Sequence, residues 1–101
     1  MPNTQQAPRQ TLKLLAQIGK HEVLILVDSG SVGTFVSEQL VKHLKLDTSA
    51  CDTSTFRAAD GGMMLCDKKV SQLRWFIQGH KFVSDAKVLP LMCYDLILGE
   101  D

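Results

Sequence analysis

Apolar and polar residues alternate along the first third of the chain in a way that predicts a hairpin. Leu12–Ile18 and Glu22–Val27 are rich in aliphatic residues, and only Gly19–His21 separate them. Two β-rich segments joined by so short a connection predict an antiparallel pair of strands. The second segment leads directly into Asp28–Gly30. We expect its strand to end at that tripeptide, because glycine and short polar residues favour turns.

One short helix is expected directly downstream, from Ser37 to Leu44. Ser37 is a good N-cap residue, and Glu38 places a negative charge in the first turn. Lys42 and His43 lie near the end of the helix, where positive charge is favoured by the helix dipole. The apolar residues of this segment would face the core.

A polar stretch over residues 47–54 separates the helix from a second predicted hairpin. Thr55–Ala59 and Met63–Cys66 form its strands, and Asp60–Gly62 form its turn. An Asp-Gly pair readily supplies the positive backbone angles that primed turns require.

A third hairpin is predicted from Leu73–Ile77 and Lys81–Leu89, joined by Gln78–His80 and ended by proline. A last apolar strand, Leu96–Leu98, stops at Gly99 and echoes the aliphatic segment before Asp28. The chain as a whole is therefore expected to be mostly β, with one short helix.

Composition excludes several function classes. The 101 residues carry 11 Lys and Arg against 11 Asp and Glu, so a zero net charge offers no general attraction for nucleic acid or an anionic membrane. The longest aliphatic run, Val23–Val27, is far shorter than the ~20 apolar residues of a membrane-spanning helix. Residues 1–10 lack the apolar centre of a secretory signal. We expect a flexible leader over residues 1–10, one domain over 11–101, and a cytoplasmic location.

No metal or cofactor site is predicted. The histidines stand near predicted turns or the helix end, without the spacing of metal ligands, and the cysteines are odd in number and widely separated. These residues are His21, His43, His80, Cys51, Cys66 and Cys93. We interpret the histidines as solvent-exposed and the cysteines as core or surface thiols.

Asp28 is the leading candidate for chemistry, because its carboxyl group follows a strand whose residues belong in a core. Burial disfavours an ionised carboxylate unless hydrogen bonds or a neighbouring charge compensate. Ser29 and Ser31 can donate such bonds, and Gly30 lets the chain turn close to the carboxylate. Taken alone, this tripeptide is more typical of a plain strand-ending turn than of a catalytic site.

Three landmarks in order make the sequence similar to a known family. Residues 25–31 and Thr34–Ser37 resemble an apolar strand, its Asp-Thr/Ser-Gly signature and the segment that follows. Ala58–Gly61 resemble a flap turn, and Tyr94–Gly99 resemble a closing apolar-apolar-glycine element. With these landmarks the chain resembles the retropepsin-like aspartic proteases, most closely the protease region of plant gypsy-type LTR retrotransposon polyproteins.

The resemblance implies an all-β, mainly antiparallel fold with one short helix, a closed barrel equivalent to half of an acid protease and active as a two-fold dimer. It places Asp28 of each copy at the dimer axis. Two carboxyl groups about 3 Å apart share a proton, so one activates a water molecule while the other donates to the peptide carbonyl oxygen. The implied activity is an aspartic endopeptidase that processes a retrotransposon polyprotein. Its partners would be a second copy and an extended peptide, with no cofactor, metal, nucleic acid or membrane.

The resemblance also assigns roles to the surrounding residues. Ser29 would link the two copies by hydrogen bonds beneath the carboxyl groups, next to Gly30. Ser31 would donate to the carboxylate and favour its charged form, which predicts an acidic activity optimum. A mobile flap would close over the substrate. This flap would consist of Ala58, Ala59, Asp60, Gly61 and Gly62.

One departure from the family pattern leaves other functions open. Members of the family usually continue past the glycine that corresponds to Gly99 with a helix and a strand, whereas only Glu100 and Asp101 follow here. We therefore expect a domain truncated at its C-terminus. The alternatives are a catalytically silent retropepsin-like domain that dimerises or binds partners, and an unrelated small β-barrel binding module.

Overall fold

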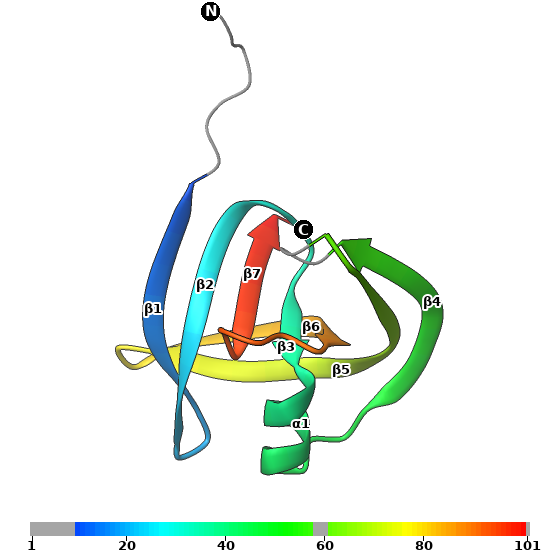
Figure 1. The fold of residues 1–101 in the computed structure, drawn as a ribbon. Coiled ribbons are helices and arrows are strands. Elements are labelled where there is room, and N and C mark those ends of the chain that lie inside the picture. The colour runs from blue at the N-terminus through cyan, green and yellow to red at the C-terminus, as the bar shows by residue number, and fades with distance from the viewer. Residues whose placement is uncertain (1–9, 58–60, 101) are drawn as a thin grey trace, which may run out of the picture.

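The computed structural model describes residues 10–57 and 61–100. Within these residues the chain forms seven strands and one helix (Figure 1): β1 Thr11–Ile18, β2 His21–Val32, β3 Phe35–Ser37, α1 Glu38–Leu44, β4 Ser49–Arg57, β5 Met63–Ile77, β6 His80–Leu89 and β7 Leu96–Glu100. Apart from Gln10, the leader expected over residues 1–10 lies outside the described residues. No helix in the described ranges is long and apolar enough to span a membrane.

The strands form one sheet that closes on itself. Their order is β1-β2-β7-β3-β6-β5-β4, and Gln17 of β1 also pairs with Phe76 of β5. This contact brings the first strand back to the far side of the sheet, so β4 alone lies outside the closure (Figure 1). The β2–β7 and β3–β6 pairs are parallel. The expected mostly β fold with one short helix is confirmed.

The first predicted hairpin is confirmed, but its second strand is longer than expected. β1 and β2 pair antiparallel from Ile18 opposite His21 to Thr11 opposite Asp28. Beyond Asp28, β2 continues to Val32, with an irregular register against β7. The expected strand end at Asp28–Gly30 is therefore wrong. The backbone of Asp28 still has a pairing partner in β1, so the strand does not need to turn there.

β5 also corrects the prediction, because one strand of 15 residues replaces the two strands expected in separate hairpins. The polar stretch in its middle is held from both sides, since Lys69 pairs with Ser49 of β4 and with Lys87 of β6. Gln72 adopts a positive φ of 54° where the register against β6 shifts. Polar side chains persist there because they point to solvent while the backbone remains paired.

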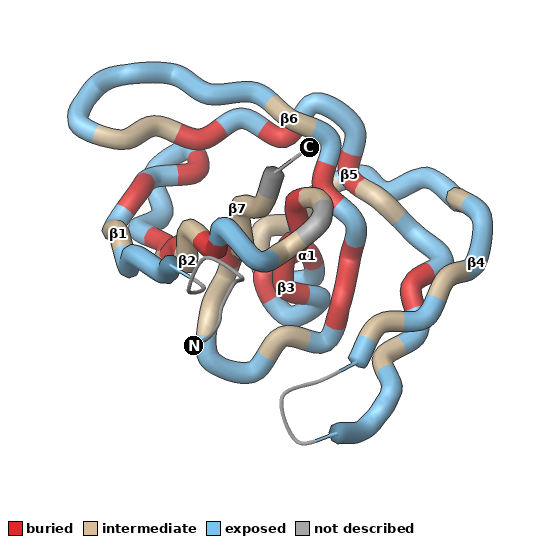
Figure 2. The backbone as a smooth tube through the Cα atoms, turned by 90° about the horizontal axis from the view of Figure 1, so that it is seen from above, coloured by how far each residue is buried: buried red, intermediate tan, exposed pale blue. Residues whose placement is uncertain are grey.

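Residues 47–54 were expected to form a polar connection. Most of this stretch instead belongs to β4, which begins at Ser49. β4 is the last strand in the sheet order. Most of its residues are exposed, as the pale blue stretches of β4 show (Figure 2). An edge strand that exposes most of its side chains needs few apolar residues, so its sequence resembles a loop.

The helix and the third hairpin follow the local sequence signals. The Ser37 hydroxyl accepts a hydrogen bond from the backbone N–H of Leu40 at 3.4 Å, as an N-cap does. Between β5 and β6 only Gln78 and Gly79 form the turn, with φ of 51° and 82°. Two positive φ values in a two-residue turn are those of a primed hairpin. Both predictions are confirmed.

The buried side chains form two clusters. The larger fills the closed sheet and includes Ile25 and Leu96, each 0% exposed. These two residues pair directly across the parallel β2 and β7, so the two similar aliphatic segments of the sequence are neighbours in space. The smaller cluster contains Phe35, Cys66 and Leu89. Half-buried residues complete it: Cys51, Phe56, Met64, Leu91 and Ile97.

Candidate active site

Asp28 is a buried carboxylate inside a paired strand. Its side chain is 3% exposed, and its Oδ1 accepts a hydrogen bond from the backbone N–H of Gly30 at 2.9 Å. A carboxylate that accepts from its own backbone two residues ahead has a defined orientation. The preceding residue, Val27, lies next to Leu98 of β7. The structure thus brings the second aliphatic segment, Leu96–Leu98, alongside the strand that leads into Asp28.

One pocket beside Asp28 has an apolar wall. This apolar pocket has a volume of about 290 Å³. Asp28, Gly30 and Ser31 line one part of it. Most of the rest comes from the smaller buried cluster and its neighbours: Phe35, Phe56, Met64, Leu89, Leu91 and Ile97, together with Arg57. A peptide side chain seated here would lie against hydrocarbon within reach of a carboxylate.

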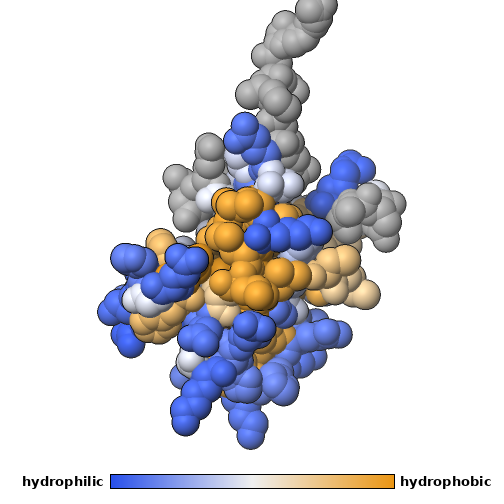
Figure 3. Space-filling model, turned by 90° about the vertical axis from the view of Figure 1, so that its left-hand side faces the viewer, coloured by the Kyte–Doolittle hydropathy of each residue, from blue (hydrophilic) through white to orange (hydrophobic). Residues whose placement is uncertain are grey.

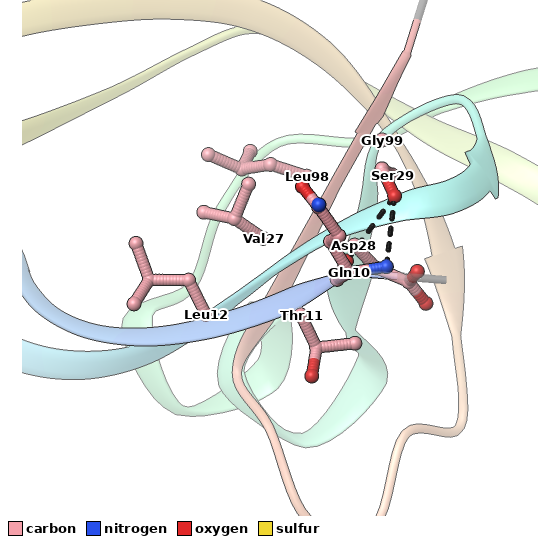
Figure 4. Close-up of a pocket in the computed structure, with 8 residues that line it drawn as sticks. All are labelled: Gln10, Thr11, Leu12, Val27, Asp28, Ser29, Leu98 and Gly99. Atoms are coloured by element: carbon pink, nitrogen blue, oxygen red, sulfur yellow. Dashed lines mark hydrogen bonds between the residues drawn. The ribbon is translucent and has the colours of Figure 1, made fainter. Parts of the chain in front are cut away.

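A second, larger pocket touches Asp28 from another side (Figure 4). Its volume is about 730 Å³, and Leu12, Val27 and Leu98 supply its apolar side chains. Figure 4 also shows Ser29 next to Gln10. The Ser29 hydroxyl accepts from the Gln10 N–H at 3.0 Å and donates to the Gln10 carbonyl at 3.3 Å. Ser29 thus ties β2 to the residue before β1.

Ser31 shares the apolar pocket with Asp28. Its hydroxyl donates to the Gly33 carbonyl at 3.5 Å, a contact at the long limit of a hydrogen bond. The bond expected from Ser31 to the Asp28 carboxylate remains a prediction. The first and third sequence landmarks meet here, because Gly99 lies against the backbone of Ser31.

The predicted flap turn lies partly outside the described residues, which exclude Ala58, Ala59 and Asp60. Gly61 and Gly62 are described and exposed. The strands on either side are paired, with Arg57 of β4 opposite Met63 of β5. The predicted second hairpin is thus present up to its turn. Because Arg57 and Met64 line the apolar pocket, the base of this hairpin lies at the pocket that contains Asp28.

The histidines and cysteines form no metal centre in the described residues, which contain no group of three or more His, Cys, Asp or Glu side chains able to hold an ion. All three histidines are exposed, as expected. His21 and His43 do lie together, with ring centroids 5.4 Å apart. All three cysteines are free thiols, with Cys66 buried and Cys93 exposed.

Several residues of the apolar pocket were missed by the sequence interpretation, including Phe35, Arg57 and Leu91. Phe35 stands within the segment after the Asp-Ser-Gly motif, and Arg57 directly precedes the predicted flap turn. Their positions next to these two motifs were thus a partial indication that they belong to the site. Which of their side chains enter the pocket depends on how β3 and β4 lie in the folded sheet.

Comparison with known proteins identifies the family. Residues 5–101 match the family model described as retroviral aspartyl protease. The chain belongs to the retroviral aspartyl protease family. Among curated proteins, the sequence comparison found no match.

Two solved structures share the fold of this retroviral aspartyl protease domain. One is the retroviral protease-like domain of Ddi1 from Leishmania major, with a TM-score of 0.64 and 18% identity over 88% of this chain and 71% of that one. The other is a retropepsin-like aspartic protease from Rickettsia conorii, with a TM-score of 0.62 and 16% identity over 88% of this chain and 73% of that one. The expected retropepsin-like fold is confirmed.

Proposed function

We propose that this chain is an aspartic endopeptidase that acts as a homodimer, with Asp28 of each copy forming the catalytic pair. The observation that carries the proposal is a 3% exposed carboxylate at the junction of two pockets, in a retroviral aspartyl protease domain. The chain contains one Asp-Ser-Gly motif. A two-fold axis next to Asp28 would bring that residue against its own copy and complete the pair.

The chemistry of such a pair needs only the two carboxyl groups and a water molecule. The ionised carboxylate takes a proton from the water, whose oxygen attacks the peptide carbonyl carbon. The protonated partner donates to the carbonyl oxygen, where negative charge develops. When the C–N bond breaks, the leaving amine takes up a proton and the pair returns to its singly protonated state.

The surface around the larger pocket supports a second copy at this position. Leu12 lines that pocket beside Asp28 and is 57% exposed, and Leu15 on the same strand is 61% exposed. Figure 3 shows apolar side chains gathered in the middle of the face that carries β1. Burying a leucine side chain contributes about 1.5–3 kcal/mol, so a partner that covers this area would gain stability.

The residues beside Asp28 have proposed supporting roles. Gly30 orients the carboxylate through its N–H. Ser29 would give up part of its hydrogen bonding to Gln10 and form hydrogen bonds to the second copy instead. Ser31 would donate to the carboxylate and favour its charged form. The Ser31→Ala variant should then move the acidic limb of the pH–rate profile to higher pH, and an unmoved limb would contradict this role.

The flap role of the hairpin after Arg57 is likewise a proposal. Residues 58–62 would close over an extended peptide and exclude water from the reacting atoms. The paired ends of β4 and β5 support this, because Arg57 and Met64 at the base of this hairpin line the apolar pocket. Gly61, with a φ of 90°, gives the turn a conformation that other residues rarely adopt.

The natural substrate we propose is the polyprotein of a gypsy-type LTR retrotransposon of plants, processed in the cytoplasm or within virus-like particles. The sequence landmarks support this assignment, since they resemble that group most closely. A catalytically silent domain that dimerises or binds partners is the alternative outcome.

Cleavage and assembly measured on the same protein test the proposal. The purified chain is incubated with polyprotein-derived peptides with and without pepstatin, and its mass is followed by sedimentation. We expect pepstatin-sensitive cleavage by a dimer, abolished in Asp28→Asn and retained in the control Asp67→Asn, whose carboxylate is exposed on β5. A folded dimer without cleavage would support the silent domain. Monomers at every concentration, with no cleavage, would overturn the proposal.

A further inference from the structure

Arg57 is the cationic member of the apolar pocket. Of the residues that line this pocket, two carry a charge, Asp28 and Arg57. Arg57 is the last residue of β4 and is exposed. Arg57 is therefore the exposed charged residue of the lining, next in the chain to the predicted flap, whereas Asp28 is buried.

The guanidinium of Arg57 is available to a ligand. Within residues 10–57 and 61–100, Lys69 and Asp85 form an ion pair at 3.9 Å, and Arg57 takes part in none. An unpaired guanidinium that borders a binding pocket can accept a carboxylate through two parallel hydrogen bonds.

A second cation strengthens the positive potential at this end of the pocket. The Lys87 ammonium lies 5.5 Å from the centroid of the Phe56 ring. Phe56 lines the pocket and makes an edge-to-face contact with Phe35 at 4.9 Å. Lys87 is therefore a second cation in contact with the apolar wall, which Arg57 and Asp28 also line.

We propose that Arg57 determines substrate specificity and selects peptides with an acidic side chain near the scissile bond. This inference rests on the proposed endopeptidase function. The apolar wall would hold an uncharged side chain beside the reacting bond, because a carboxylate there would be repelled by Asp28. In an extended peptide, side chains two positions apart share a face and lie roughly 7 Å apart. The acidic residue therefore belongs within two or three positions of the apolar one.

A charge scan of the substrate tests this inference. Peptides with one apolar pair at the cleaved bond carry a single Glu, Gln or Lys at each of three flanking positions on either side, and kcat/KM is measured for each. We expect Glu to be preferred over Gln by about tenfold at one or two positions, as for a charge-assisted pair. Arg57→Gln should remove this ratio, Arg57→Lys should retain part of it, and Arg57→Glu should favour Lys instead. The control Lys81→Gln, an exposed residue of β6, should leave the ratio unchanged.

The result separates failure of this inference from failure of the proposed function. If the wild type cleaves peptides and the ratio of Glu to Gln is the same in Arg57→Gln, the specificity role is wrong and the endopeptidase survives. If no peptide is cleaved, the endopeptidase fails, and binding of the same peptides is measured by fluorescence anisotropy. Preferential binding of Glu peptides that Arg57→Gln abolishes would then support the charge selection, and equal binding of Glu and Gln peptides would overturn it.

Discussion

Gly99 of β7 lies directly against the backbone of Ser31, so closely that a Cβ at position 99 would overlap the Ser31 carbonyl oxygen. The same Cβ would come within 2.5 Å of the Gly33 carbonyl oxygen. Both obstructing atoms belong to backbone, which cannot rotate aside as a flexible side chain can. β7 continues through this glycine to Glu100 and does not stop at it as expected. Glycine is required at position 99 because the backbone of Ser31 and Gly33 passes it at close range.

The Gly99→Ala substitution should destabilise the protein strongly. Overpacking against rigid backbone costs about 3 kcal/mol or more when the neighbours cannot relax, and the displaced segment carries Ser31. The free energy of unfolding in urea measures the loss. Gly19→Ala is the control, since its Cβ would meet nothing within 4 Å and its φ of 62° costs only about 1 kcal/mol. Equal losses in the two variants would contradict the steric explanation.

Asp95 should stabilise the fold through its side chain, although it lies outside both pockets beside Asp28. Its Oδ2 accepts from the backbone N–H of Leu24 at 2.8 Å, and its own N–H donates to the Leu24 carbonyl at 2.9 Å. Asp95→Ala would leave the Leu24 N–H unpaired, at a cost of about 1–3 kcal/mol. Asp95→Asn should lose less, because an amide oxygen can still accept. Thermal or urea unfolding of both variants tests this order, and a fully stable Asp95→Ala would refute it.

Ser37 should contribute to stability as the N-cap of α1. Its hydroxyl accepts from the Leu40 N–H, and the serine is 3% exposed, so water cannot readily replace the bond. Ser37→Ala should lower the free energy of unfolding by about 1 kcal/mol. Ser71→Ala, at an exposed position of β5, serves as the control and should change it little. The prediction fails if the two substitutions have the same effect.

Alkaline pH should destabilise the fold through Cys66. Burial raises the pKa of the Cys66 thiol above its ordinary value of 9.0, so the folded state retains this proton more strongly than the unfolded state. The contribution is complete below about pH 9 and is lost as the pH rises through the folded-state pKa. The free energy of unfolding of the reduced protein should therefore fall more steeply above about pH 9 in the wild type than in Cys66→Ala, by up to about 1.4 kcal/mol per pH unit. Parallel curves would show that Cys66 does not contribute.

Local signals predicted the elements whose geometry depends on neighbouring residues. Gly79 permits the positive φ of the turn between β5 and β6, and Ser37 satisfies an N–H at the start of the helix. Both interactions act over two or three residues, so the sequence contains all the atoms involved. The hydrogen bond from the Gly30 N–H to the Asp28 carboxylate is equally local, although Ser29 and Ser31 were the donors expected from the sequence.

Long-range pairing explains what the sequence did not predict. The polar middle of β5 resembles a connection, yet Lys69 has a partner strand on either side, and these backbone hydrogen bonds keep it extended. β4 resembles a loop for a related reason, because it pairs on one edge with β5 and needs few buried side chains. The amino-acid composition of a segment indicates how far its side chains are buried. It does not show whether the backbone of that segment pairs with another strand.

The same distinction between local and long-range interactions applies to the candidate site. The sequence by itself determined the carboxylate, its adjacent glycine and serines, and the aliphatic segment that precedes them, because a motif is a run of neighbouring residues. Only the tertiary structure decided that Gly99 lies under Ser31 and that Arg57 joins Asp28 in one pocket. These residues are far apart in the chain, and their approach is set by the register of paired strands, which depends on the burial of the whole core.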